Sequence, residues 1–218
     1  MTQASQRPLQ PGDPAPEFVL PAVQTERTVS LSDYRDRSPL LLALFRGLYC
    51  PFCRRAIAQM AVSADRLKPF GIQSLAVVAT ELENARLYYR FRPMRLDLAV
   101  DPALSTHRSY GVPKPGATPD FLRTFDSLRF DADGELPAPL PMQDAVHALD
   151  TIDAFQPNAV DQRDAEQQFT QLTGQFLIDR GGIIRWANIE CAREGPAGLG
   201  KFPTHEELLT AAQIAVSA

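Results

Sequence analysis

The chain has 218 residues, of which 44% are hydrophobic, and its 22 basic and 26 acidic residues give a formal net charge of −4. This length allows one well-packed core and is short for two ordinary domains. The acidic balance argues against nucleic acid or an anionic membrane as the main partner, and no apolar run approaches the roughly 20 residues that a membrane-spanning helix needs.

The composition of residues 1 to 14 predicts a flexible leader. They are rich in Gln, Pro and Ser, and they lack the apolar stretch of a secretory signal. The three cysteines of the chain are too few, and odd in number, for the disulfide framework of a small secreted protein. We therefore expect a cytoplasmic protein with one domain over residues 15 to 218.

The first predicted elements are a hairpin, a buried strand and a helix. Alternating residues over 17 to 20 and 28 to 31 favour a short N-terminal hairpin. Residues 40 to 45 form a continuous apolar run, which is typical of a strand buried on both faces. After Gly47 the apolar residues recur every three or four positions, which predicts an amphipathic helix from about residue 51 to 68.

Strands and helices then alternate. Buried strands are predicted over residues 72 to 79 and 96 to 100, and helices over 81 to 91 and 101 to 110. Thr80 is expected to open a capping box for the first of these helices.

A long insertion follows over residues 113 to 175. It contains many Pro and Asp residues and no strong strand pattern, although residues 144 to 155 and 161 to 172 favour helices. A stretch of this length inside one domain is usually functional or disordered. We interpret it as a lid or as a contact in a homodimer.

The regular pattern returns near the C-terminus. Residues 176 to 179 and 183 to 189 flank a glycine turn and predict an antiparallel hairpin, and Thr204 is expected to cap a last helix that runs to about residue 216. The order of elements predicts an α/β fold with a mixed central sheet, helices on both faces, an N-terminal hairpin extension and the insertion before the terminal hairpin.

Cys50 and Cys53 lie where the first buried strand gives way to a helix. A cysteine in the first turn of a helix faces unpaired N–H groups and the positive end of the helix dipole, which favour the thiolate. Arg46, Arg54 and Arg55 add positive charge nearby. We expect the thiolate of Cys50 to attack a disulfide or a peroxide, and Cys53 to resolve the product as an intramolecular disulfide.

Zinc binding and simple burial are the alternative interpretations of this pair. A structural zinc site needs four ligands, and the other candidates are scattered without a second pair: Cys191, His107, His147 and His205. The sequence also has no phosphate-binding glycine loop and no dinucleotide motif. We therefore predict neither a metal nor an organic cofactor.

Arg46 and Arg54 are the candidate catalytic residues beside the cysteines, although an arginine on an exposed helix face is often only solvated. Tyr49 either shields the thiolate or packs. Cys191 is interpreted as a buried structural cysteine, and His107 as a packing or surface residue rather than a catalytic base.

Four segments around the cysteine pair form a recognisable pattern: GDPAPEF at 12 to 18, SLSDY at 30 to 34, YGV at 110 to 112 after Asp101, and FLIDRGGIIR at 176 to 185. They resemble the peroxiredoxin-like proteins of the alkyl hydroperoxide reductase/thiol-specific antioxidant class in the thioredoxin superfamily. The resemblance covers about residues 10 to 112 and 173 to 215 and leaves the insertion outside.

The resemblance implies a thioredoxin-like fold. It also implies that Cys50 is the peroxidatic or attacking cysteine and Cys53 its local resolving partner. The implied partners are a small peroxide or disulfide substrate and a reductant, either a dithiol protein such as a thioredoxin or glutathione.

The chain departs from the family at three positions. Ala43 and Gly47 stand where typical members have Pro and Thr, and Thr173 stands where they have Arg; that Thr and Arg polarise and hold the peroxide. Pro51 and Phe52 between the cysteines are instead similar to glutaredoxins. Peroxidase activity, favoured by the overall resemblance, and disulfide reductase activity, favoured by the departures, both stay open, as does a non-catalytic thiol- or metal-binding module.

Overall fold

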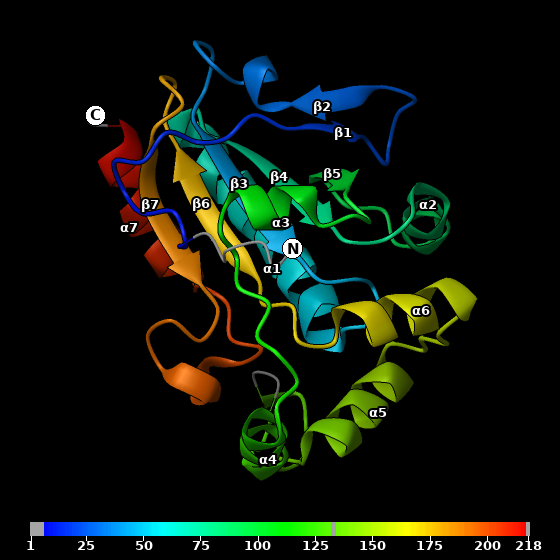
Figure 1. Ribbon diagram of the computed structural model, residues 1–218. Helices are drawn as coiled ribbons and strands as arrows, with labels where there is room; N and C mark the ends of the chain where they lie inside the picture. The colour runs from blue at the N-terminus through cyan, green and yellow to red at the C-terminus, as the bar shows by residue number, and fades with distance from the viewer. Residues whose placement is uncertain (1–6, 132–133, 217–218) are drawn as a thin grey trace, which may run out of the picture.

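A mixed five-stranded sheet forms the centre of the computed structural model, which describes residues 7–131 and 134–216 (Figure 1). Its strands are β3 (Leu40–Phe45), β4 (Gln73–Val78), β5 (Asp97–Val100), β6 (Gly174–Ile178) and β7 (Ile184–Ile189). Their order is β5-β4-β3-β6-β7, and β3 pairs in parallel with β4 and antiparallel with β6. The β4–β5 pair is parallel and the β6–β7 pair is antiparallel, as predicted for a terminal hairpin.

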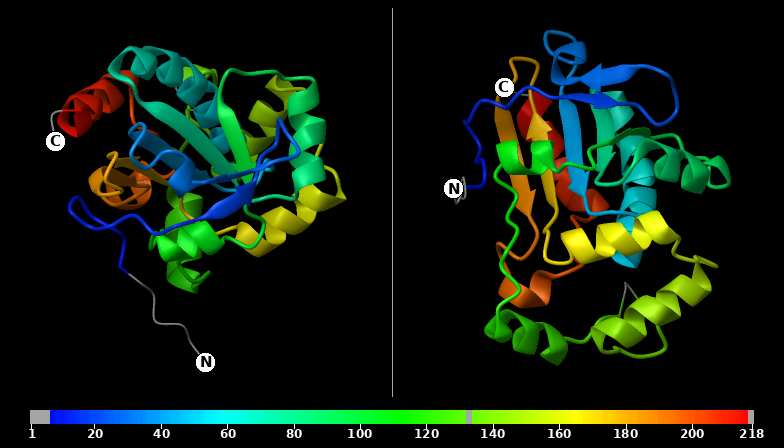
Figure 2. Two further views of the ribbon diagram at one scale, coloured as in Figure 1. Left: turned by 90° about the horizontal axis from the view of Figure 1, so that it is seen from above. Right: turned by 45° about the vertical axis from the view of Figure 1, so that its right-hand side comes forward.

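Helices cover both faces of the sheet. The views in Figures 1 and 2 place α1 (Pro51–Leu67) and α7 (His205–Val216) on one face and α3 (Ser105–Ser109) on the other. The connection between β4 and β5 contains α2 (Leu82–Arg90). The described residues also include the short 3-10 helices η1 (Leu31–Asp33), η2 (Lys68–Phe70) and η4 (Gly195–Gly198).

The central strand β3 is buried along its whole length, as its apolar sequence predicts. It has a paired strand on each side and lies between the two helical layers, so side chains on both of its faces leave water. Burial of each large aliphatic side chain contributes about 1.5–3 kcal/mol. This strand fixes the position of the loop that follows it and therefore of Cys50.

The predicted N-terminal hairpin is present as β1 (Val19–Pro21) and β2 (Thr28–Ser30), which pair antiparallel. The sequence predicts that the residues before the hairpin form a flexible leader over residues 1 to 14, and the structure differs from this prediction. Residues 1–6 lie outside the described residues. Over residues 7–14 the chain packs on the domain, because Leu9 is buried and its N–H donates to the carbonyl of Tyr110 at 3.2 Å.

Thr80 does not cap α2, contrary to the prediction. Its side chain is fully buried, and its hydroxyl donates to the carboxylate of Asp164 at 2.6 Å. Glu81 takes the N-cap position without a side-chain capping bond. At the last helix the predicted cap is present, since the Thr204 side chain accepts from the N–H of Glu207 at 3.2 Å.

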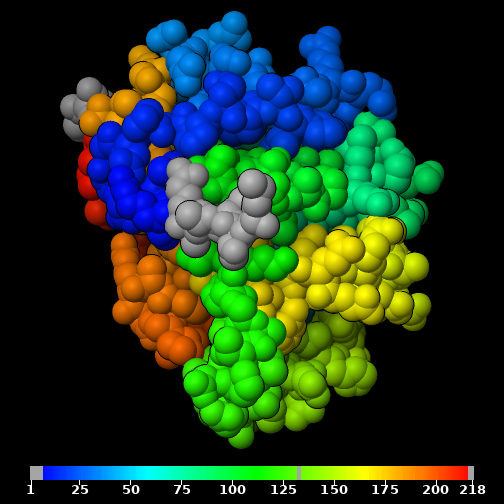
Figure 3. Space-filling view, in the orientation of Figure 1, coloured from blue at the N-terminus to red at the C-terminus, as the bar shows by residue number. Residues whose placement is uncertain are grey.

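In its described residues, the insertion forms three α-helices at one end of the sheet: α4 (Pro119–Ser127), α5 (Met142–Ile152) and α6 (Ala159–Gln168). Figures 1 and 3 show them together at the lower end of the molecule. The sequence predicts the last two within a few residues and misses α4. Their buried apolar residues join the main core, as at Phe130 and Leu149, so the insertion extends the same domain.

Buried polar groups attach α6 to α2 and to the end of β4. The amide of Asn84 donates to Asp161 at 2.8 Å, and Asn158 donates to Asn84 at 2.7 Å. Buried polar atoms that are fully paired fix one arrangement of the elements that carry them. In the described part of the chain, no helix has the length and apolar character that crossing a bilayer requires.

Candidate active site

Cys50 occupies the N-cap of α1, and Pro51 takes the first helical position, where its missing N–H costs little. The sulfur of Cys50 accepts a hydrogen bond from the N–H of Cys53 at 3.4 Å. Cys50 is 6% exposed and Cys53 only 1%. The structure thus brings the two predicted thiols together at the start of the helix, with Cys50 the more accessible.

The surroundings of the two thiols give them different pKa values. Burial opposes the thiolate of Cys50, but the hydrogen bonds from Cys53 and the positive charge of Arg46 outweigh it and lower the pKa of Cys50 to about 6, despite the opposing charge of Glu190. Burial and the neighbouring Cys50 raise the pKa of Cys53. At neutral pH, Cys50 is therefore the thiolate and Cys53 the thiol.

Arg46 follows β3 and lies in a buried ion pair. Its Nη2 is 2.9 Å from Oε1 of Glu190, and its Nη1 donates to the carbonyl of Gln171 at 3.0 Å. Glu190 also accepts the N–H groups of Thr173 at 2.9 Å and of Gly200 at 2.7 Å. Nε of Arg46 has no hydrogen-bond partner among the described residues, which leaves one buried donor free near Cys50.

Arg54, the other predicted catalytic arginine, faces the insertion. Its guanidinium donates to the carbonyl of Leu48 at 2.8 Å and contacts Asp150 at 2.6 Å and Asp153 at 2.7 Å. It also lies 4.0 Å from the ring centre of Phe155. Through these contacts, Arg54 holds the loop before Cys50 and the end of α5 in place. Arg54 is therefore a positioning residue.

Arg55 has a similar orientation. It lies 2.9 Å from Asp153 and 2.8 Å from Glu135. The sequence predicts that this arginine adds positive charge beside Cys50. Carboxylates of the insertion offset that charge, and Arg46 is the arginine that lowers the pKa of Cys50.

Tyr49 and Gln168 connect α6 to the loop that carries Cys50. The hydroxyl of Tyr49 donates to the carbonyl of Gln168 at 3.0 Å, and the Gln168 side chain accepts the N–H of Gly47 at 3.2 Å. The same side chain donates to the carbonyl of Ala79 at 2.9 Å. Sequence reasoning missed Gln168 and Glu190, because neither stands in a motif and both lie more than a hundred residues from the cysteines along the chain.

A chamber of about 810 Å³ lies between Cys50 and the insertion. Arg46, Tyr49, Cys50 and Phe52 contribute from the sheet and α1. The insertion contributes mainly apolar side chains: Leu122, Phe125, Met142, Val146 and Phe169. Sequence reasoning did not identify these residues, since apolar positions in an unassigned segment carry no chemical signal of their own.

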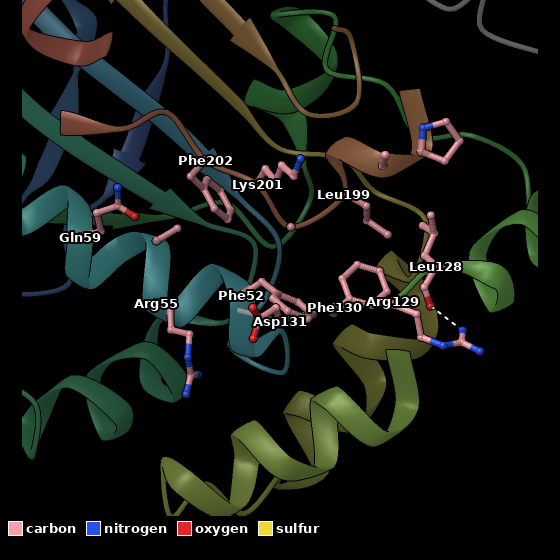
Figure 4. Close-up of a pocket in the computed structure, with 14 residues that line it drawn as sticks. Phe52, Arg55, Gln59, Leu128, Arg129, Phe130, Asp131, Leu199, Lys201 and Phe202 are labelled. Carbon is pink, nitrogen blue, oxygen red and sulfur yellow. Dashed lines mark hydrogen bonds between the residues drawn. The ribbon is translucent and has the colours of Figure 1, made fainter. Parts of the chain in front are cut away.

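A second cavity, of about 410 Å³, borders Phe52, and Figure 4 shows the residues that line it. Phe52 and Leu199 line both cavities and stand between them. Phe52 packs on Phe130 of the insertion with ring centres 5.4 Å apart. The aromatic residue between the two cysteines therefore separates the chamber from its neighbour.

His107 and Cys191 lie outside the lining of the chamber. His107 is fully buried, and burial, together with the charges of Arg46 and Arg108 and against that of Asp101, lowers its pKa to about 4. Cys191 is partly exposed, where the sequence predicts burial, because it follows β7 on a turn with φ of +66°. Burial and the charge of Glu190 raise its pKa to about 11.

The described residues contain no group of three or more His, Cys, Asp or Glu that could hold a metal ion. A sequence model described as the AhpC/TSA family matches residues 11–187. The chain belongs to the AhpC/TSA family. Members of this family are thiol oxidoreductases, and the chain carries the corresponding pair of thiols in Cys50 and Cys53. The resemblance inferred from the sequence is confirmed.

Solved structures with related folds include members of two functional types. Reduced 2-Cys peroxiredoxin from Plasmodium vivax has a TM-score of 0.59 at 15% identity, covering 94% of this chain and 81% of that chain. Peroxidoxin BcpB from Mycobacterium tuberculosis has a TM-score of 0.58 at 12% identity, covering 96% and 97%. A thiol:disulfide interchange protein DsbE from Chlorobium tepidum has a TM-score of 0.53 at 21% identity, covering 94% and 99%.

At these identities the likeness shows the fold alone, and it confirms the predicted thioredoxin-like arrangement. The comparison with curated proteins found no match.

Proposed function

We propose that this AhpC/TSA protein reduces hydroperoxides through a dithiol–disulfide cycle at Cys50 and Cys53. One observation carries the proposal: at the base of the chamber lies a thiol whose pKa is lowered to about 6, next to a second thiol whose pKa is raised. The first group is a nucleophile at neutral pH and the second keeps its proton until it is needed.

The chemistry takes two steps before reduction. The Cys50 thiolate attacks the terminal oxygen of the hydroperoxide, the O–O bond breaks, and the alcohol or water leaves after taking a proton. This step oxidises Cys50 to a sulfenic acid. The sulfur of Cys53 then attacks the sulfur of Cys50 and releases water, and the product is an intramolecular disulfide that an external thiol reduces.

Arg46 supplies the positive charge that the chain lacks at residue 173. Its guanidinium reaches the segment before β6, where it binds the carbonyl of Gln171 and shares Glu190 with the N–H of Thr173. Arg46 also lines the chamber, and we assign its guanidinium as the cation that faces the peroxide oxygens. A fixed cation beside the reacting oxygens stabilises the charge that develops there.

Reduction of small disulfides is the second candidate. It is favoured by Gly47 and Thr173, which place neither the Thr nor the Arg of typical members near Cys50. The enclosed position of Cys50 favours small oxidants of either type over protein disulfides. We keep a reducing cytoplasmic compartment as part of the proposal, since the cycle needs a supply of thiols.

The test is a titration of the pre-reduced protein with hydrogen peroxide, with tert-butyl hydroperoxide and with oxidised glutathione. We expect fast loss of two thiols with a peroxide and a Cys50–Cys53 disulfide by mass spectrometry. Oxidation by oxidised glutathione alone would favour the second candidate.

Two variants separate the roles of the thiols. Cys50→Ser is expected to abolish peroxide consumption, and a full rate in this variant would exclude the mechanism. Cys53→Ser is expected to stop at a sulfenic acid on Cys50, which dimedone traps and mass spectrometry detects.

A further inference from the structure

Both cysteines of the redox pair are buried, and α4 and α5, called the cover below, line the chamber in front of Cys50. Cys50 is 6% exposed and Cys53 1%. Of the two, Cys50 lines the chamber beneath α4 and α5. A reductant must therefore reach the sulfur of Cys50 through this chamber.

The chamber has the size of a small-molecule site. Its volume of about 810 Å³ falls within the roughly 300–1,000 Å³ of ligand pockets in proteins. Its mouth has polar residues from the insertion, Asp126, Gln143 and Asp144, which are exposed. A small polar molecule fits a space of this size and can enter between these residues.

A cluster of ion pairs holds the cover closed. Asp153, at the end of α5, lies 2.7 Å from Arg54 and 2.9 Å from Arg55, and both arginines belong to the helix that starts at Cys50. The side chain of Arg54 is 2% exposed and that of Arg55 15%. The Asp153 side chain is 21% exposed, but it pairs with two arginines at once, and ion pairs that form such a network hold a contact more firmly than an isolated surface pair.

We infer that the Cys50–Cys53 disulfide is reduced by a low-molecular-weight thiol that enters the chamber, and that the cover excludes protein dithiols. This inference rests on the proposed disulfide cycle and names its reductant.

The reduction consumes two thiol molecules. The first thiolate attacks the sulfur of Cys50, a mixed disulfide forms as the Cys50–Cys53 bond breaks, and Cys53 leaves and takes up a proton. A second thiolate attacks the sulfur of the bound thiol, and Cys50 leaves as a thiolate. Two thiols become one small disulfide, and the protein gains the two electrons.

The test compares two reductants on the same disulfide. The disulfide is formed in the purified full-length protein with diamide, and reduction is followed by alkylation and mass spectrometry with reduced glutathione and, separately, with a reduced thioredoxin. An oxidised peptide spanning residues 48 to 55 is the control, because it carries the same disulfide without a cover.

For each substrate we divide the rate of reduction by thioredoxin by the rate of reduction by glutathione. We expect this ratio to be at least about a hundredfold lower for the protein than for the peptide. The reason is that attack depends on access to the sulfur. Equal ratios would overturn the inference. Because diamide makes the disulfide, a failure of peroxide to oxidise Cys50 would count against the proposed function and leave this result unchanged.

A variant tests the role of the ion pairs. Asp153→Ala is expected to raise the thioredoxin rate about tenfold and the glutathione rate less than about threefold, as the cover opens more often. An equal rise for both reductants would contradict size exclusion.

Asp120→Asn, which removes the Arg123–Asp120 ion pair on α4, is the matched control and is expected to change neither rate. Should Asp153→Ala fail to fold, Glu135→Gln weakens the outer contact of Arg55 and is expected to give a smaller change of the same kind.

Discussion

Arg46 adds to the hydrogen bond from Cys53 in favouring the thiolate of Cys50. It ranks among the favourable causes of the lowered pKa, together with the hydrogen bonds from Cys53. The three arginines near the motif look equivalent in the sequence. The structure distinguishes them, because Arg54 and Arg55 are paired with carboxylates of the insertion and Arg46 is paired with Glu190 next to the thiols.

Removing the charge of Arg46 is expected to raise the pKa of Cys50 above about 6. Burial then opposes the thiolate with less compensation, so the thiolate fraction at neutral pH falls. In Arg46→Met with Glu190→Gln, which removes both charges of the pair, we expect the midpoint of the alkylation rate against pH to move upward by about one unit or more.

This prediction is checked by measuring the rate of iodoacetamide alkylation of Cys50 from pH 4 to 10. This range brackets both the lowered pKa of Cys50 and the ordinary pKa of a cysteine thiol. Arg46→Lys, which keeps the charge, is expected to show a smaller shift. The assignment of Arg46 fails if the double variant titrates like the unchanged protein.

At the scale of elements, the N-terminal segment packs against the end of α3. Gly111 has φ of +68°, and a Cβ at this position would lie 2.2 Å from the carbonyl oxygen of Arg7. Backbone atoms cannot rotate away from such a contact as a flexible side chain can. The close approach therefore requires glycine.

Gly111→Ala is expected to destabilise the fold by about 2 kcal/mol or more, through the clash and the left-handed backbone together. Chemical denaturation measures the free energy of unfolding. Gly71→Ala is the matched control, since Gly71 has φ of +73° with open space around it, and it is expected to cost about 1 kcal/mol. Equal losses in the two variants would mean that the segment before residue 12 does not pack on Gly111.

Most elements of the central fold follow from local patterns. The apolar run of β3 and the helical spacing of α1 are visible in the sequence, and both elements lie within a residue or two of the predictions. Thr80 shows where local patterns fail. A capping box is a local feature, but the carboxylate that binds Thr80 comes from Asp164 in the insertion, 84 residues away.

At the scale of the whole molecule, the three cysteines lie in three different environments. Cys50 is a thiolate at the chamber, Cys53 is a buried thiol, and Cys191 is partly exposed with its pKa raised to about 11. Exposure alone would rank Cys191 first in reactivity. Acidity ranks Cys50 first, because the thiolate is the nucleophile.

With limiting iodoacetamide at pH 7, we expect Cys50 to react at least about tenfold faster than Cys191, and Cys53 to react last. An acidic thiol is intrinsically the weaker nucleophile, but its larger thiolate fraction outweighs this effect. Peptide mapping by mass spectrometry measures the order. In Cys50→Ser the slow reaction at Cys191 is expected to remain. Labelling of Cys191 before Cys50 in the unchanged protein would contradict the lowered pKa of Cys50.

The α/β order, the family and the redox pair can be predicted from the sequence alone, because each depends on residues close together in the chain: an apolar run, a helical period, and two cysteines three positions apart. The packing in three dimensions shows which arginine lies beside Cys50, where the insertion lies and how deeply the sulfur is buried. Glu190 contacts Arg46, Gln168 contacts Gly47, and the apolar wall of the chamber lies beside Cys50, all through the packing of β7 and the insertion helices. Charge compensation and access depend on distances in space, and no local pattern records them.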